Sequence, residues 1–242
     1  MDIIYKYPKL PWNWNEISKN PAITLSIIEN NPDLPWKWGY SGISNNPNIT
    51  FDFIKKYLNK YMFWFSISSN PVITIDIIEN NPDLPWYWSE ISSNPNITID
   101  IIENNPNLPW NWSLGVSSNP NLTIEYIKNN LDKDWDWFCI SRNPVITMDI
   151  IENNMDLSWD WNGVSSNPNI TLEFIKKYPY KNWDWDYISK NSAITMDIIE
   201  NNMNLPWNWD VGVSYNPNLN IEFIKKYPDK NWNWLWISLK MY

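Results

Sequence analysis

The sequence has no histidine, a single cysteine and only five glycines in 242 residues. Histidine is the commonest general base and metal ligand of proteins, so its absence argues against acid–base catalysis and against a bound transition metal. The lone thiol, Cys139, cannot form a disulfide within the chain. We therefore expect a protein that is not an enzyme and that carries no cofactor. An enzyme built on a pair of aspartates is the weakest alternative.

Long apolar runs and an excess of positive charge are also missing. No stretch of 18 apolar residues exists, and the N-terminus lacks the basic and apolar segments of a secretory signal, so we expect a soluble, intracellular protein without a membrane partner. The 18 basic residues are outnumbered by 27 acidic ones, which gives a net charge of −9. A surface of that sign repels a phosphate backbone, so nucleic acid is not an expected partner.

Tryptophan is abundant instead, with 20 residues, and nearly all of them belong to a W-x-W motif that recurs about every 24 residues. The first position of this motif is occupied by Trp12, Trp36, Met62, Trp86, Trp110, Trp135, Trp159, Trp183, Trp207 and Trp232. The longer spacings have their extra residues between the second Trp and the next Ile or Val, which indicates a tolerant loop. We number these ten cycles from the N-terminus and expect residues 1–242 to form a single domain of stacked repeats.

The first half of a cycle has the pattern of a short helix, as in residues 73–82. Thr74 is placed to cap this helix, and Ile73 and Ile78 occupy the two positions of a hydrophobic staple. The helix should end before Pro82, since proline does not continue a helix.

The second half begins with Leu-Pro-Trp, and proline favours the first position of a helix, so we expect a second helix from Pro85 onward. Trp88 and Ile91 lie three residues apart on one face, whereas Trp86 must point elsewhere and can seal the contact with the neighbouring cycle. A short 3-10 segment fits this half equally well. Helices of about seven residues are unstable alone, so these can persist only by stacking.

These features predict an all-α fold, a solenoid of about ten 24-residue repeats in which each repeat has two short helices, the second either α or 3-10. A β-solenoid is the alternative, because segments such as N-I-T-I-D-I-I favour strands. The scarcity of glycine and the missing L-x-x-L-x-L-x-x-N pattern of leucine-rich repeats argue against it.

The segment N-I-T-I-D-I from Asn96 to Ile101 resembles the leucine-rich repeat variant, a bacterial family of 24-residue helical repeats. That resemblance implies alternating α- and 3-10 helices in a right-handed superhelix, although the W-x-W half departs from the charged helix of that family. The longer unit from Ile101 to Thr123, with its N-N-P-N-L-P-W-N-W run, is similar to Trp- and Asn-rich repeat proteins of giant DNA viruses. This similarity implies a viral protein in the host cytoplasm, nucleus or virion, and it brings no catalytic residues.

Equivalent positions of successive cycles should line up in columns. The Asn before Pro and the Ser two residues earlier are expected to satisfy turn backbone groups, as internal ladders. A further column alternates in sign through Lys128, Glu152, Lys176, Glu200 and Lys225, so we expect ion pairs between these residues in neighbouring cycles.

The position between the two tryptophans is the main candidate for function. It carries Asp136, Asp160 and Asp184 in three successive cycles, followed by Asn208 and Asn233. Like charges placed opposite one another destabilise a fold, so we expect a partner that keeps them there, either a basic protein segment or a hard cation such as Ca²⁺. A solvated acidic face without a partner is the competing interpretation.

Cycle 3 offers a second candidate surface, because Tyr57, Tyr61, Phe63 and Phe65 replace more polar residues and Met62 replaces a tryptophan. Aromatic enrichment is typical of protein interfaces, whereas drift in one degenerate cycle explains it equally well. We therefore expect a non-enzymatic scaffold that binds a protein partner. The alternative is a structural component that self-associates into a homo-oligomer through uncapped solenoid ends.

Overall fold

The computed structural model describes residues 2–7 and 9–240, and these residues form short helices without any strand. Along the described chain, a first kind of helix in the N-P-x-I-T half of a cycle alternates with a second kind that follows W-x-W. The predicted all-α repeat fold is therefore confirmed, and the β-solenoid alternative is wrong.

The two kinds of helix have similar lengths throughout, with five to seven residues in the α-helices and three in the 3-10 helices. The first helices are α1 (Asp2–Lys6), α3 (Leu25–Asn30), α4 (Phe51–Lys56), α6 (Ile75–Glu79), α8 (Ile99–Asn104), α9 (Ile124–Asn129), α11 (Met148–Asn153), α13 (Leu172–Lys177), α15 (Met196–Glu200) and α16 (Ile221–Lys226). The second helices are α2 (Trp14–Lys19), η1 (Ile43–Asn45), α5 (Trp64–Ser68), α7 (Trp88–Ser93), η2 (Val116–Ser118), α10 (Trp137–Arg142), α12 (Trp161–Ser166), α14 (Trp185–Lys190), η3 (Val213–Tyr215) and α17 (Trp234–Lys240).

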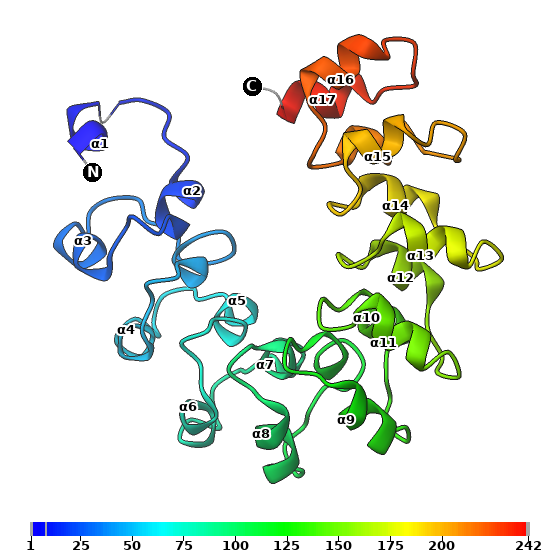
Figure 1. Cartoon of the computed structure of the whole chain (residues 1–242). Helices are drawn as coiled ribbons and strands as arrows, with labels where there is room; N and C mark the ends of the chain where they lie inside the picture. The colour runs from blue at the N-terminus through cyan, green and yellow to red at the C-terminus, as the bar shows by residue number, and fades with distance from the viewer. Residues whose placement is uncertain (1, 8, 241–242) are drawn as a thin grey trace. The chain divides into compact units, whose positions relative to one another are not determined.

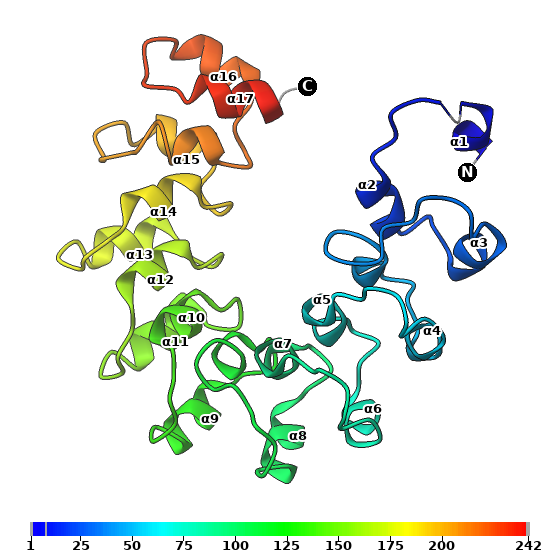
Figure 2. The ribbon, with the colours of Figure 1, turned by 180° about the vertical axis from the view of Figure 1, so that it is seen from behind.

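The chain divides into two compact units, Met1–Asn111 and Trp112–Tyr242. Within the first unit, the second helices α2, η1, α5 and α7 contact one another in succession, and η2, α10, α12, α14, η3 and α17 do the same within the second. In each unit the second helices form one row and the first helices another (Figure 1), and Figure 2 shows the same rows from behind. Such stacking supplies the stability that helices of this length lack alone.

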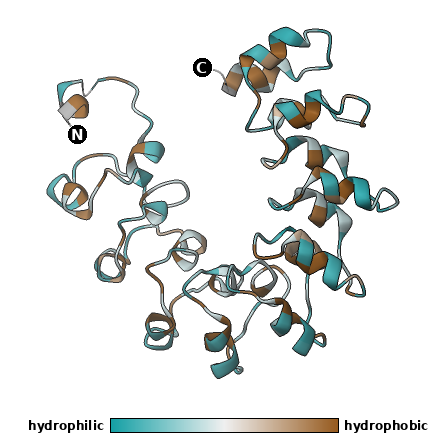
Figure 3. Cartoon of the chain, viewed as in Figure 1, coloured by the Kyte–Doolittle hydropathy of each residue, from teal (hydrophilic) through white to brown (hydrophobic). Residues whose placement is uncertain are grey.

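Apolar side chains fill the space between the two rows. Figure 3 shows that the short helices carry both hydrophobic and hydrophilic residues. The aliphatic residue that follows the second Trp is completely inaccessible at Ile43, Ile67, Ile91, Val116, Ile140, Val164, Ile188 and Val213. One such column runs through each unit, so every stacked helix contributes to a shared core.

The first helices begin as the sequence predicts. The Thr74 hydroxyl accepts a hydrogen bond from the backbone N–H of Ile77 at 3.4 Å, and Ile73 and Ile78 are both buried. The same cap recurs at Thr24, Thr50, Thr98, Thr123, Thr147, Thr171 and Thr195, with Asn220 in the last cycle. A cap of this kind contributes about 1 kcal/mol to helix stability.

The second helices begin later than predicted. Helix α7 starts at Trp88, and Pro85 lies in the preceding turn, so the expectation of a helix from Pro85 onward is wrong. The reason is that Trp86 is fixed outside the helix. Its indole Nε1–H donates to the carbonyl of Asn81 at 2.9 Å, and its backbone N–H donates to the carbonyl of Leu84. The residue between the two tryptophans therefore becomes the N-cap.

Inserted residues decide whether the second helix is α or 3-10. The three cycles with η1, η2 and η3 have one or two extra residues between the second Trp and the buried Ile or Val. In cycle 9 the backbone N–H of Val213 reaches the carbonyl of Asn208 at 2.7 Å, and a Cβ on Gly212 would lie 2.4 Å from that oxygen. The inserted residues lie where the sequence places them, between the second Trp and the buried Ile or Val, and they replace the first α-helical turn with a wider one.

The tryptophans of neighbouring cycles pack against each other. The second Trp of one cycle meets the first Trp of the next edge to face, with ring centroids 5.1 to 5.6 Å apart and planes at 85° to 89°. These pairs are Trp14–Trp36, Trp64–Trp86, Trp88–Trp110, Trp112–Trp135, Trp137–Trp159, Trp161–Trp183, Trp185–Trp207 and Trp209–Trp232. The predicted seal between cycles is confirmed, and each pair contributes about 0.5–1.5 kcal/mol beyond its buried area.

Two side-chain ladders also join neighbouring cycles. The Ser141 hydroxyl accepts the backbone N–H of Asp160 at 3.0 Å. The Asn167 Nδ2 donates to the carbonyls of Ser141 at 2.8 Å and Ile146 at 2.9 Å. Asparagine bonds of this kind recur at Asn46, Asn94, Asn143, Asn191 and Asn216. The predicted internal ladders are confirmed.

Ion pairs between cycles lie one position away from the predicted column. Lys177 pairs with Glu152 of the preceding cycle, whereas Lys176 donates to the amide oxygen of Asn202 in the following cycle at 2.7 Å. The same pair forms between Lys226 and Glu200 and between Lys56 and Glu29. Adjacent residues of a helix point about 100° apart, so only the second lysine faces backward. The predicted pairing of Glu152 with Lys176 is therefore wrong.

The Glu152 carboxylate also accepts the hydroxyl of Tyr178 at 2.8 Å. Hydrogen bonds from Lys177 and then from Tyr178 favour the charged carboxylate and lower the pKa of Glu152 below its ordinary value. The same two contacts, from Lys226 and Tyr227, lower the pKa of Glu200. The two lysines are exposed and the two glutamates are only half-buried, so these pairs serve to fix the register between cycles more than to stabilise them.

Candidate functional site

The three aspartates between the tryptophans are the N-caps of α10, α12 and α14. The Oδ1 of Asp160 accepts the backbone N–H of Gly163 at 2.8 Å, and Asp136 and Asp184 make equivalent bonds of 2.9 to 3.0 Å. All three side chains are half-buried, and within the described chain none of them forms an ion pair. We call these three residues the acidic column.

The acidic column is held in register by the serine ladder. The backbone N–H groups of its three members donate to serine hydroxyls of the preceding cycles, each at 3.0 Å, namely Ser117, Ser141 and Ser165. A carboxylate is also favoured at a helix N-terminus, because the unpaired N–H groups there are positive. Capping thus gives these three aspartates a structural role that does not depend on a partner.

Asn208 and Asn233 continue the column but use both ends of their amide groups. The Oδ1 of Asn208 accepts the N–H of Val211 at 3.0 Å, while its Nδ2 donates to Asp186 of the preceding cycle at 2.5 Å. Asn233 bonds in the same way to Trp236 and Asp210. A carboxylate cannot donate and would repel Asp186, so an amide is needed here. The five candidates of this column therefore separate into three carboxylates and two internally tied amides.

The aromatic residues of cycle 3 also fall into two groups. Met62 is buried in the slot of the first Trp, and Tyr57 packs on Trp38 with ring centroids 4.9 Å apart, so both belong to the contacts between cycles. The more open group comprises Tyr61, Phe63 and Phe65. Tyr61 is 80% exposed and Phe65 is 40% exposed.

The open group extends to two residues that the sequence did not single out. Tyr40 meets Phe63 at 5.1 Å, and Tyr87 meets Phe65 at 5.8 Å between ring centroids. We call Tyr40, Tyr61, Phe63, Phe65 and Tyr87 the aromatic cluster. The signal was present in the sequence, since Tyr40 lies in an insertion loop and Tyr87 lies between two tryptophans, where side chains reach the surface.

The described residues show neither a metal-binding cluster nor a membrane-spanning helix. No three cysteine, aspartate or glutamate side chains in this part of the chain gather to hold a metal ion. No described helix is long and apolar enough to cross a lipid bilayer. No protein family, no curated protein and no solved structure matches the chain. The acidic column and the aromatic cluster are thus the two candidate binding surfaces.

Proposed function

We propose that the chain is a solenoid of ten 24-residue repeats, akin to the Trp- and Asn-rich repeat proteins of giant viruses, and that it acts as a non-enzymatic scaffold for a protein partner. The support is that both ladders and the tryptophan pairs join neighbouring cycles. Stacked repeats of this kind present extended surfaces that bind proteins. The aromatic cluster offers one such surface, because aromatic side chains dominate the energetics of interfaces.

The acidic column is the surface that supports the proposal best, because its charge exceeds what capping requires. Asn13 and Asn233 cap their helices from the same position with neutral amides. Asparagine and aspartate are about equally good caps. Three carboxylates in a row therefore add a negative potential that the fold does not need, and a segment rich in lysine or arginine is the partner that such a potential attracts.

The triple variant Asp136→Asn, Asp160→Asn and Asp184→Asn separates binding from folding. Because asparagine keeps the caps, we expect the free energy of unfolding to change by less than about 1 kcal/mol. Affinity for a lysine- and arginine-rich peptide should fall by roughly tenfold or more, and added salt should weaken the wild-type complex. Isothermal titration calorimetry at two salt concentrations measures both effects.

A matched control changes charge without touching the column. Asp100, Asp149 and Asp197 are exposed, lie in the first turns of first helices and are not caps, so replacing all three by Asn removes the same net charge. We expect this control to bind the peptide nearly as tightly as the wild type. Equal losses in the two triple variants would show that only net charge matters, and an unchanged affinity in both would refute the proposal.

A further inference from the structure

Four tryptophan rings in the described chain carry a lysine ammonium group on them. Each lysine lies two residues before the first W-x-W position of a cycle and reaches the second Trp of the cycle before. The pairs are Lys60 on Trp38, Lys133 on Trp112, Lys181 on Trp161 and Lys230 on Trp209, with the Nζ 5.8, 5.2, 4.4 and 4.7 Å from the ring centroid. These distances are typical of cation–π contacts, so the ring at this position accepts a cation.

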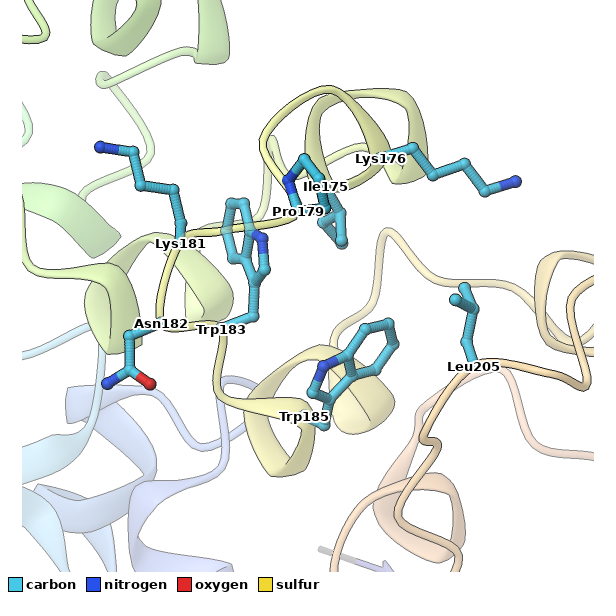
Figure 4. Close-up of a pocket in the computed structure, with 8 residues that line it drawn as sticks. All are labelled: Ile175, Lys176, Pro179, Lys181, Asn182, Trp183, Trp185 and Leu205. Carbon is cyan, nitrogen blue, oxygen red and sulfur yellow. The ribbon is translucent and has the colours of Figure 1, made fainter.

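At Leu108 and Leu205, which replace that lysine, a cavity opens beside the ring. In the first unit, Trp86, Trp88 and Leu108 line a cavity of about 380 Å³, with Glu79 at its edge. In the second unit, an equivalent cavity of about 420 Å³ lies beside Trp185. Figure 4 shows this second cavity among the rings of Trp183 and Trp185, Ile175, Pro179 and Leu205, while the ammonium groups of Lys176 and Lys181 point away from it.

The residue at the edge position correlates with the residue over the ring in the next cycle. A glutamate at the edge goes with a lysine over the ring, and a lysine at the edge goes with a leucine. In the sequence, Glu29, Glu103, Glu152 and Glu200 are followed in the next cycle by Lys60, Lys133, Lys181 and Lys230. The lysines at the same edge position, Lys55, Lys128 and Lys176, are followed by Leu84, Leu157 and Leu205. Glu79 alone breaks this rule, because Leu108 follows it.

Glu79, like Glu103, lacks the second lysine that serves the other three glutamates. Lys56, Lys177 and Lys226 reach back to Glu29, Glu152 and Glu200, but Asn104 occupies the corresponding position after Glu79. Glu79 is exposed and forms no ion pair within the described chain. The first unit thus combines an open cavity, an accessible tryptophan ring and an uncompensated carboxylate.

We infer that this cavity, which we call the lysine pocket, binds the side chain of a lysine from a partner protein. The ammonium group takes the place that Lys181 and Lys230 fill on their own rings, and Glu79 supplies the counter-charge. The inference rests on the proposed function for the class of partner, a basic segment. It assigns that partner a specific contact outside the acidic column.

The cavity beside Trp185 is the internal control. Its edge carries Lys176 where the lysine pocket has Glu79, so it has similar aromatic walls but the opposite charge. A cation should therefore discriminate between the two cavities, whereas a purely apolar ligand should not.

Titration of the full chain with a blocked tripeptide that has a central lysine tests the pocket, with the Trp88 indole N–H resonance as the readout. We expect a shift with a dissociation constant in the millimolar range, and a much smaller shift for the tripeptide in which norleucine replaces lysine. Glu79→Gln should weaken binding about fivefold. Leu108→Lys should abolish it, because the new side chain covers Trp88 as lysine does in four other cycles.

The matched variant Leu205→Lys fills the other cavity and should leave binding at Trp88 unchanged. Equal shifts with norleucine, or full affinity in the Leu108→Lys variant, would overturn the inference. Both lysine substitutions copy a natural arrangement, so circular dichroism should report the wild-type helix content. The triple variant of the acidic column should still bind the tripeptide at Trp88, so failure of the lysine pocket and failure of the acidic column give different results.

Discussion

Replacing Asn167 by alanine is expected to lower the free energy of unfolding by about 3–5 kcal/mol. The Nδ2 of this completely buried side chain donates to the carbonyls of Ser141, Asn143 and Ile146 at 2.8 to 3.2 Å. Its Oδ1 accepts the backbone N–H of Asn169 at 2.8 Å. Alanine leaves these groups of two cycles without partners in a place that water does not reach, and each unsatisfied group costs about 1–3 kcal/mol.

Urea denaturation followed by circular dichroism measures this loss, and Asn169 provides the control. Its Nδ2 donates to the carbonyls of Pro144 and Ile146, but the side chain is only half-buried, so water replaces the lost bonds in Asn169→Ala. We expect that variant to lose less than about 1 kcal/mol. Similar losses in the two variants would mean that burial of the amide does not decide its contribution.

Replacing Trp159 by alanine is expected to cost about 3–5 kcal/mol. The ring is 6% exposed, meets Trp137 of the preceding cycle edge to face at 5.6 Å, and donates its Nε1–H to the carbonyl of Asn154 at 2.7 Å. Alanine therefore leaves a cavity between two cycles and breaks the bond that holds the turn before α12.

Methionine at the same position gives a sharper comparison, because cycle 3 has Met62 there, buried at 7% exposure. Trp159→Met should fill most of the cavity and lose the aromatic pair and the indole bond, at a cost of about 2 kcal/mol. Thermal and urea unfolding rank the three proteins. If alanine and methionine were equally destabilising, the indole bond and not packing would be the main contribution of Trp159.

The sequence alone predicts the start of the first helices, and it predicts the side-chain ladders and the tryptophan contacts between cycles. Capping by Thr74 depends only on neighbouring residues, so local rules identify it. The asparagine and serine ladders follow from periodicity, because a buried polar residue that recurs at a fixed spacing must find its partner in the next cycle. The same reasoning assigned one Trp of each pair to the contact between cycles.

Local rules failed where a distant contact competes with helix formation. Pro85 favours a helix start, but the indole bond of Trp86 to Asn81 holds that segment in a turn, and the sequence does not reveal this bond. The ion pairs were displaced by one residue for a similar reason. Periodicity gives the column, whereas the direction in which Lys176 or Lys177 points depends on the rotation of the helix in its stack.

Periodicity of the sequence locates the candidate site between the two tryptophans, but it does not explain why the column changes from aspartate to asparagine. Sequence alone separates Asp184 from Asn208 by charge, yet the reason for the change is the donor bond from Asn208 to Asp186. The sequence does not predict the lysine pocket either, because it places Trp88 on the face of Ile91 and Trp86 at the contact between cycles. The cation–π contacts of four lysines, Lys181 and Lys230 among them, show that one face of the second Trp accepts a cation.

Neighbouring cycles are held together by equivalent contacts, so one whole period can be removed. Deleting residues 136–159, which is 24 residues, joins Trp135 to Asp160 and offers Ser117 and Asn119 to the ladder groups of the next cycle. We predict that this protein keeps its helix content per residue and unfolds cooperatively in urea, whereas deleting residues 136–147, half a period, unfolds the chain around the junction. Equal behaviour of the two deletions would contradict the repeat architecture.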